Sequence, residues 1–398
     1  MDNPFHMSFF RHVYSRLTSL HLSIPYDIMS FTVSERSFMQ FANLCNSSRN
    51  DFSLKELSVN LVDIGTASTD VLHPFEVAFN KLLPILGQLQ NIMIKSDCCL
   101  ESIPLLRYIG SHPDIASMTI DIKASKSYYS KLIEALPANL QHLTIDQEKV
   151  PQGEWIKMSR LTKLKTINFI SSLVLAGPDF IDFLVHNSSL VSLAKVRIPV
   201  DIGQDCRNVL KNKRNITSLN LVMANKADDP SHVDLHSDVT KLRINCEHGE
   251  KSPTNCSILG TRNALPHLAE LRVSSMCPQM EEELIGLVGR SESLRVLKID
   301  RPFDEEFITR LLDSVMSNKN SSLQVLSFRG LTWTKCVMSK VSEFLLHPNT
   351  KNFNRLKTSH KTIKDLQLVE DAIETTTTLS DQFDYQLTEK AMYFIRIN

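Results

Sequence analysis

The sequence predicts an α/β solenoid, in which short parallel strands and helices alternate along a stack of repeated units. Three observations support this prediction. An apolar pattern, with apolar residues at positions 1, 4 and 6 of a short segment, recurs about thirteen times along the chain of 398 residues. The twelve steps from Leu17 to Phe353 cover 336 residues, so the mean period is 28, which suits a repeated strand–turn–helix unit. An apolar stripe with helical spacing follows several of these segments, and polar turns separate the elements.

Each unit opens with a segment that has the properties of a short, half-buried strand. In Ile216-Thr-Ser-Leu219-Asn-Leu221, positions 4 and 6 alternate with polar residues, as the two faces of a strand require. We expect strands of about four or five residues. The units start at Leu17, Leu54, Leu89, Ile115, Leu140, Leu164, Leu193, Ile216, Val239, Leu268, Leu294, Leu323 and Phe353.

The residues that follow the strands predict helices. After Asp304, Glu305 and Glu306, apolar residues recur at helical spacing over residues 307–315, and the preceding acids suit the positive end of a helix dipole. Similar stripes occur in residues 128–136, 180–184 and 284–288. Each unit is therefore expected to run strand, turn, helix, turn.

These units resemble leucine-rich repeats, in the longer helix-containing forms of the ribonuclease-inhibitor type and the F-box-associated type. The resemblance covers about Leu17 to Ser359. It implies a horseshoe with parallel strands on the concave face and helices on the convex face. The family places Asn or Cys at position 9 of the unit, whereas this chain has, for example, Val62, Ser172 and Pro302 there. We therefore expect irregular turns whose backbone groups bond to water or to side chains.

The predicted organisation is a solenoid of about thirteen units over residues 1–359, followed by a C-terminal cap or tail over residues 360–398. Within the tail, Ala391 to Ile397 has the pattern of a last strand or helix. We expect it to cover the open end of the core, as terminal repeats require. The longest gaps between units predict longer helices or insertions at residues 24–53 and 60–88.

Composition excludes several classes of protein. Lys plus Arg number 44 and Asp plus Glu also number 44, which argues against non-specific binding of nucleic acid or of a membrane by the whole molecule. The eight cysteines are scattered and form no Cys-x-x-Cys pair, which favours a reduced, intracellular protein. Met1 to Tyr14 lacks the apolar segment of a secretory signal, and no run of 18 apolar residues is present. We expect a cytoplasmic protein, with the nucleus as the alternative location.

The sequence contains no signature that favours an enzyme. The phosphate-binding glycine motifs, the nucleophile-elbow motif and the His-Glu-x-x-His zinc motif are all absent. Cys246-Glu247-His248 is the one fragment that suggests a metal or a nucleophile, but a polar turn after a strand explains it better, because four spaced ligands cannot be assembled around it. We expect no catalytic residues, no cofactor and no metal site.

The outward-facing strand positions differ in charge between the early and the late units. Positions 3, 5 and 7 are mostly neutral or mildly acidic in the first six units. In the later units they carry cations, interrupted by Glu270 and Asp300. These predicted partner-binding residues are Lys195, Arg197, Lys241, Arg243, Arg272, Lys298, Arg329, Arg355 and Lys357. One interpretation is that the cations only keep an exposed sheet soluble; the other is that the surface attracts an acidic protein partner.

The leading functional hypothesis is a non-enzymatic scaffold for protein–protein interaction, because solenoids display a long binding surface. The resemblance suggests a more specific version, a substrate-recognition subunit of a ubiquitin ligase similar to the F-box leucine-rich repeat proteins. Those proteins carry a helical F-box, and we find no such helical segment before Leu17. The alternative is a regulator that inhibits or activates an enzyme or a small GTPase. A basic surface does not match an inhibitor of a basic nuclease.

Overall fold

The computed structural model describes most of the repeat region and part of the C-terminal segment. The described residues are 18–26, 54–63, 83, 89–99, 101–146, 150–151, 153–174, 178–198, 204–223, 231–232, 235–246, 256–259, 265–300, 304–329, 334–353, 355–358, 383–387 and 392–396.

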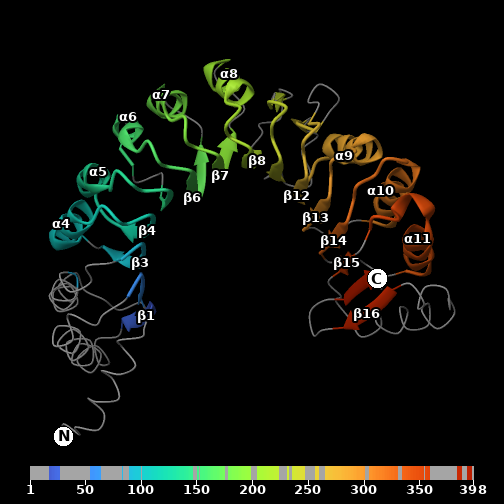
Figure 1. Cartoon of the computed structure of the whole chain (residues 1–398), viewed down its shortest axis with the longest axis horizontal. Helices are drawn as coiled ribbons and strands as arrows, with labels where there is room; N and C mark the ends of the chain where they lie inside the picture. Colours follow the sequence, from blue (N-terminus) through green and yellow to red (C-terminus); the bar gives the residue numbers. More distant parts are fainter. Residues whose placement is uncertain are drawn as a thin grey trace, which may run out of the picture. The chain divides into compact units, whose positions relative to one another are not determined.

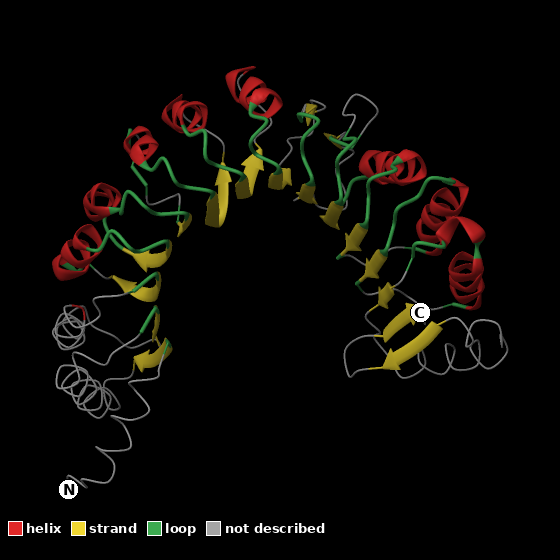
Figure 2. Cartoon of the chain, in the orientation of Figure 1, coloured by secondary structure: helices red, strands yellow, loops and turns green. Residues whose placement is uncertain are grey.

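The chain divides into two compact units, one of Met1–Leu173 with Gly177–Val191 and the other of Val174–Ala176 with Ser192–Asn398. Within each unit the parallel strands form a sheet on one side, and the helices lie on the other side (Figure 1, Figure 2). We call these the strand side and the helix side. The fold prediction is confirmed, since thirteen parallel strands occur at the thirteen predicted units.

The strands follow the order of the sequence in each unit. Those of the first unit are β1 (Ser19–Tyr26), β2 (Glu56–Asp63), β3 (Asn91–Cys99), β4 (Ser117–Lys123), β5 (His142–Ile145) and β6 (Thr166–Val174). Those of the second unit are β7 (Ser192–Ile198), β8 (Ser218–Met223), β10 (Lys241–Cys246), β12 (Glu270–Ser275), β13 (Val296–Ile299), β14 (Val325–Phe328) and β15 (Arg355–Thr358). Several strands are longer than the predicted four or five residues, up to nine in β3 and β6.

The helices include those predicted from the four apolar stripes, which lie in α5, α7, α9 and α10. The first unit contains α4 (Ile103–Ser111), α5 (Lys126–Ala135), α6 (Glu154–Lys157) and α7 (Pro178–His186), and the second contains α8 (Gln204–Asn212), α9 (Pro278–Arg290), α10 (Glu305–Ser317) and α11 (Lys335–Leu346). Asp304, predicted to lie at a helix start, is the N-cap of α10, and its carboxylate accepts a hydrogen bond from Phe307 N at 2.8 Å. No helix among the described residues has the length and hydrophobicity needed to cross a bilayer.

Two of the connections between successive strands of the sheet contain a short strand, which the predicted order of strand, turn, helix and turn does not include. Between β8 and β10, and between β10 and β12, the described residues hold the short strands β9 (Ser231–His232) and β11 (Cys256–Ser257), which pair in parallel with each other. The connections between successive strands from β3 to β8 and from β12 to β15 each contain a helix among the described residues.

The core consists of aliphatic side chains stacked from strand to strand. Position 4 of one repeat is the direct register partner of position 4 in the next repeat. Leu219, Leu242 and Leu271 therefore lie in one row. All three are at most 3% exposed, and Leu297 and Leu326 continue the row at 0%. Because successive strand residues point to opposite faces, this row requires positions 3 and 5 to lie on the strand side.

The seventh leucine-rich segment of the sequence, the one that forms β7, begins three residues earlier than predicted. Leu193, predicted to be its position 1, pairs with Leu219, which is a position 4. The buried residue at position 1 is therefore Leu190. A register shift between Leu193 and Val196 places one extra residue in β7, so Lys195 and Arg197 do not occupy the predicted positions 3 and 5.

The C-terminal segment extends the sheet with an antiparallel hairpin. β17 (Met392–Arg396) pairs with β15, and β16 (Phe383–Leu387) pairs with β17. Of the two alternatives predicted for Ala391 to Ile397, the strand is confirmed. The insertions predicted at residues 24–53 and 60–88 lie largely outside the described residues, and β1 and β2 continue into their first few residues.

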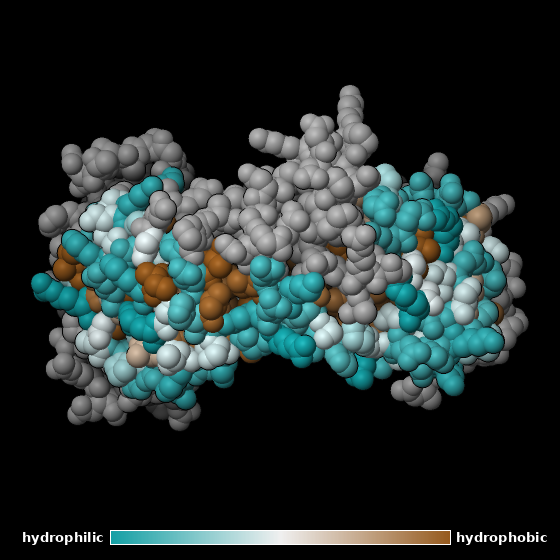
Figure 3. All heavy atoms as spheres, turned by 90° about the horizontal axis from the view of Figure 1, so that it is seen from above, coloured by the Kyte–Doolittle hydropathy of each residue, from teal (hydrophilic) through white to brown (hydrophobic). Residues whose placement is uncertain are grey.

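The helix side of the first unit carries a few exposed apolar side chains. Viewed toward the helix side, hydrophobic residues show at the surface between polar ones (Figure 3). On the helices of this unit, Ile103 on α4, Ile156 on α6 and Val185 on α7 are 42%, 42% and 53% exposed. Single exposed residues of this kind are normal for a folded domain and carry no functional conclusion.

Candidate functional site

The candidate site is on the strand side of the second unit, where three cationic residues stand next to one another on neighbouring strands. Arg243 on β10 is the direct register partner of Arg272 on β12, and Arg272 is the direct register partner of Lys298 on β13. Neighbouring strands in a sheet lie about 4.8 Å apart. Arg243, Arg272 and Lys298 therefore form a row that crosses the strands, and we call it the basic row.

The local sequence explains why these side chains face outward. Each of them lies between two core residues, as Arg272 lies between Leu271 and Val273, which are 0% and 1% exposed. The alternation of a strand then places the cation on the opposite side of the sheet from the core. All three members of the basic row are half-buried, because neighbouring strands flank them.

Two acidic residues on the strand side bind two members of the basic row. Asp300 accepts a hydrogen bond from Arg272 Nε, and Glu270 accepts one from Lys298 Nζ at 2.8 Å. The side chains of Asp300 and Glu270 are only 18% and 32% exposed. These contacts hold Arg272 and Lys298 in fixed orientations, because each pair joins two adjacent strands.

The acids neutralise only part of the positive charge. Four cations, Lys241 and the three members of the basic row, stand on β10, β12 and β13. Glu270 and Asp300 supply two negative charges, which leaves a formal net charge of +2 on this surface. The surface is therefore positive even though the whole chain is neutral.

Arg243 is the least compensated member of the row, because Asp300 and Glu270 make their hydrogen bonds to Arg272 and Lys298. Burial lowers the pKa of the Arg243 guanidinium, the adjacent Arg272 lowers it further, and Asp300 acts in the opposite direction. Hydrogen bonding from Lys298 lowers the pKa of the Glu270 carboxyl, against the opposing effect of burial. An arginine stays protonated at neutral pH, so an anion placed beside Arg243 would relieve its repulsion with Arg272.

The structure brings together only some of the predicted partner-binding residues. Lys241, exposed on β10, stands beside the basic row. Arg329, which follows β14, and Arg355 on β15 are also exposed, but Ser327 on β14 separates the basic row from β15. Lys195 and Arg197 lie on β7, and Lys357 lies on β15; the side chains of these three lie outside the described part of the chain.

The strand side of the first unit has a different character. Its corresponding row contains Ser58, Met93 and Thr119 in direct register. Some of its polar side chains bond to one another, as when Asn91 Nδ2 donates to Glu56 Oε1 at 2.9 Å. This surface offers hydroxyl and amide groups in place of a row of cations.

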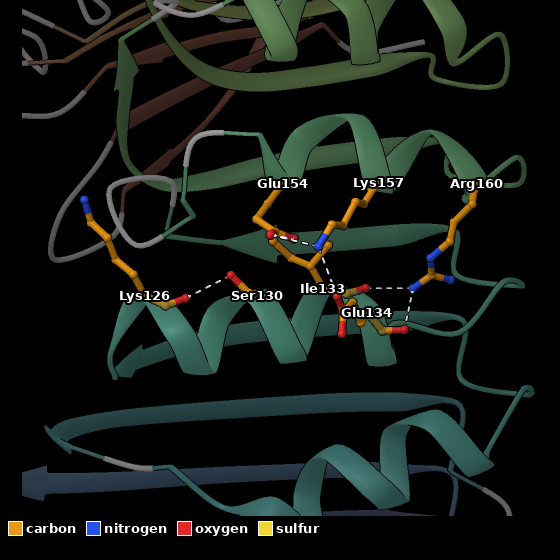
Figure 4. Close-up of polar contacts among 7 residues, drawn as sticks. All are labelled: Lys126, Ser130, Ile133, Glu134, Glu154, Lys157 and Arg160. Atoms are coloured by element: carbon orange, nitrogen blue, oxygen red, sulfur yellow. Dashed lines mark hydrogen bonds and ion pairs between the residues drawn. The ribbon is translucent and has the colours of Figure 1, made fainter.

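A set of polar contacts between neighbouring coils was not predicted from the sequence. In the first unit, the Arg160 guanidinium donates to the carbonyls of Ile133 and Glu134 at 2.7 and 2.9 Å (Figure 4). It also donates to the carbonyl of Leu136 at 2.8 Å, so it satisfies the C-terminal end of α5. Lys157 Nζ lies 3.0 Å from carboxylate oxygens of both Glu134 and Glu154 (Figure 4). These contacts join α5 to the next coil, so we assign them a structural role.

The second unit uses an asparagine for the same purpose. Asn318 Nδ2, in the turn after α10, donates to the carbonyls of Val288 and Ser291 in the preceding coil at 3.1 and 2.8 Å. Side chains in the turns before the strands thus satisfy backbone carbonyls, although position 9 lacks the family's asparagine. A single buried asparagine in a polar turn gives too weak a sequence signal to identify this role.

The described residues contain no arrangement that suggests catalysis or metal binding. They include no group of three or more His, Cys, Asp or Glu side chains placed to hold a metal ion. Cys246 is buried, and its Sγ lies 3.8 Å from Met280 Sδ in the core. Glu247 and His248 lie outside the described part of the chain. Cys246 therefore has the surroundings of a packing residue.

No protein-family model matches the chain, and no curated protein matches it. Among solved structures, it is similar to the leucine-rich repeat-containing protein LegL7 from Legionella pneumophila, with 12% identity, a TM-score of 0.39 and coverage of 77% of this chain and 93% of LegL7. It is also similar to Drosophila Toll in its complex with Spätzle, with 12% identity, a TM-score of 0.34 and coverage of 79% and 41%. For TLR13 in its complex with ssRNA13, the identity is 11%, the TM-score is 0.30 and the coverage is 81% and 59%. The chain thus spans less than two thirds of the Toll and TLR13 chains, and these likenesses concern the repeat fold alone.

Proposed function

We propose that this leucine-rich repeat solenoid is a non-enzymatic protein-interaction scaffold that binds an acidic protein partner on its basic row. The observation that supports the proposal is the direct register of Arg243, Arg272 and Lys298 on three neighbouring strands. A surface with a net positive charge attracts an oppositely charged partner and speeds its encounter. Solubility alone would require only scattered charges of either sign.

The scaffold proposal is tested by affinity purification followed by mass spectrometry. The informative variant reverses all three members of the basic row, Arg243→Glu, Arg272→Glu and Lys298→Glu. The matched control reverses three cations on the helix side or in its turns, Arg310→Glu, Lys319→Glu and Lys351→Glu, all exposed in the second unit. Each triple variant changes the net charge from 0 to −6, because each reversal changes it by two.

We expect the basic-row variant to lose acidic partners that the control variant retains. Equal loss from both variants would show that net charge, and not this surface, governs binding. Retention by both would remove the basic row from the binding surface. Circular dichroism of both variants establishes that they remain folded.

The more specific proposal is that the chain is a substrate-recognition subunit similar to the F-box leucine-rich repeat proteins. It rests on the resemblance of the repeats, and its test is recovery of the ubiquitin-ligase adaptor in the same purification. Recovery of an enzyme or a small GTPase without the adaptor would instead support the regulator hypothesis. Either result is compatible with a scaffold. The scaffold proposal and the more specific ligase-subunit proposal can therefore fail independently of each other.

A further inference from the structure

We propose that the segment bound by the basic row is an acidic α-helix that lies across the strands, with carboxylates on one helical face at i, i+4 and i+7. This proposal rests on the proposed function, and it adds the conformation and the charge spacing of the partner. It follows from three properties of the basic row: its spacing, the fixed orientation of its side chains and the incomplete compensation of Arg243.

The spacing of the basic row favours a helix over an extended segment. Three neighbouring strands span two interstrand distances, or about 9.6 Å. Residues i, i+4 and i+7 of an α-helix lie on one face and rise about 10.5 Å along the axis. Three alternate residues of an extended segment, which also share a face, span about 13 Å. The helix therefore matches the pitch of the strands more closely.

Spacing discriminates between these partners because two of the three cations, Arg272 and Lys298, are oriented by contacts within the sheet. Arg272 engages Asp300 through Nε, and Lys298 engages Glu270 through Nζ. A guanidinium bound through Nε still has the two terminal Nη groups to offer a carboxylate, and an ammonium bound once still has two donors. The two internal acids thus orient the cations without using all of their donors, and a partner with mismatched spacing would have to break these contacts.

Arg243 is the position at which a partner carboxylate gains most. It is half-buried, and its direct neighbour on β12 is another arginine. Glu270 and Asp300, the acids that face this row from β12 and from the end of β13, make their hydrogen bonds to Lys298 and Arg272. A carboxylate seated between Arg243 and Arg272 would accept charge-assisted hydrogen bonds from both and relieve their mutual repulsion.

The test measures binding of two fluorescein-labelled peptides to the full chain by fluorescence anisotropy at low ionic strength. Both peptides are short, helical, rich in Ala and Gln, and identical in composition. One carries Glu at i, i+4 and i+7, on a single helical face, and the other carries Glu at i, i+1 and i+2, which point to different sides of the helix. We expect the first peptide to bind about tenfold more tightly, because the second loses two of its three ion pairs.

The control variants assign the preference to the basic row. Arg243→Gln should abolish the preference between the two peptides, whereas Arg310→Gln on the helix side should preserve it. Equal binding of the two peptides, tighter binding of the second peptide or binding of neither would overturn the helical partner. Under each of these results the scaffold proposal still stands if the triple reversal of the basic row removes acidic partners from the affinity purification.

Discussion

At the scale of single residues, His236 couples the stability of the second unit to pH. This histidine is 5% exposed and lies in the turn before β10. Its Nδ1 accepts a hydrogen bond from Asp238 N at 3.2 Å, so in the neutral ring Nε2 carries the hydrogen and donates to Ile216 O at 2.8 Å. Burial lowers the pKa of His236 and Arg214 adds to the effect, while the Ile216 carbonyl and Asp238 oppose it.

The sign of the pH effect follows from these contacts. The unfolded chain binds a proton at His236 near the ordinary pKa of about 6.5, whereas the folded chain keeps the ring neutral to lower pH. Its contribution to the free energy of unfolding is therefore complete above pH 6.5 or so and declines as the pH falls below that value. We expect urea unfolding of the wild type to show this decline as the pH falls from about 6.5 to 5.5.

The variant His236→Gln should remove that part of the pH dependence, although it is less stable at neutral pH. His186→Gln is the matched control, because His186 is exposed at the end of α7. An unchanged pH slope in His236→Gln would show that another group is responsible.

At the scale of elements, two glycines of α9 should respond in opposite ways to the same substitution. A Cβ on Gly289 would lie 2.5 Å from Ser314 Oγ of α10, whose hydroxyl donates to Ile285 O at 2.7 Å. Gly286 is exposed, and its added Cβ would meet only the flexible end of Arg290 at 3.1 Å. Gly289→Ala should therefore lower the free energy of unfolding by about 1–3 kcal/mol. Gly286→Ala should raise it by up to about 1 kcal/mol, because alanine favours the helix.

Chemical denaturation of the two variants tests this contrast between close helix packing and helix propensity. Stabilisation by Gly289→Ala would mean that α9 and α10 are free to separate there. Equal effects of the two substitutions would show that propensity alone decides the outcome.

The sequence predicted the existence of the strands and helices better than their exact registers. The apolar period places most strands correctly because each core position must be apolar. It misplaced the seventh repeat because Leu193, Val196 and Ile198 fit the pattern, whereas a start at Leu190 puts Lys195 at position 6. Only the register shift in β7, which brings Val196 opposite Leu221, reveals the true start. The strands β9 and β11 also left no clear signal in the sequence, since they have only two residues each.

The charged positions of the candidate site were predicted in part. Strand alternation identifies Arg243, Arg272 and Lys298 as outward-facing residues. The sequence does not show that Asp300 and Glu270 bind to cations on the adjacent strand, because those contacts depend on side-chain orientation. The acids that interrupt the cations in the sequence therefore orient them in the structure.

At the scale of the whole molecule, the account rests on an uneven distribution of charge in a neutral chain. The formal net charge is 0, yet β10, β12 and β13 present an excess of two positive charges on the strand side. Net charge alone would give no attraction for an acidic partner, so any attraction must come from the local surface. The repeat architecture makes this possible, because the pitch of the strands arranges equivalent positions of successive units in a row.

The most direct test of this account is the affinity of the full chain for a labelled poly-glutamate peptide, measured by fluorescence anisotropy. Three proteins are compared: the wild type, the triple reversal of the basic row and the triple reversal of Arg310, Lys319 and Lys351. The account predicts that the basic-row variant loses at least about tenfold in affinity relative to the control variant of equal net charge. Equal affinities of the two variants would contradict the claim that the basic row is the binding surface.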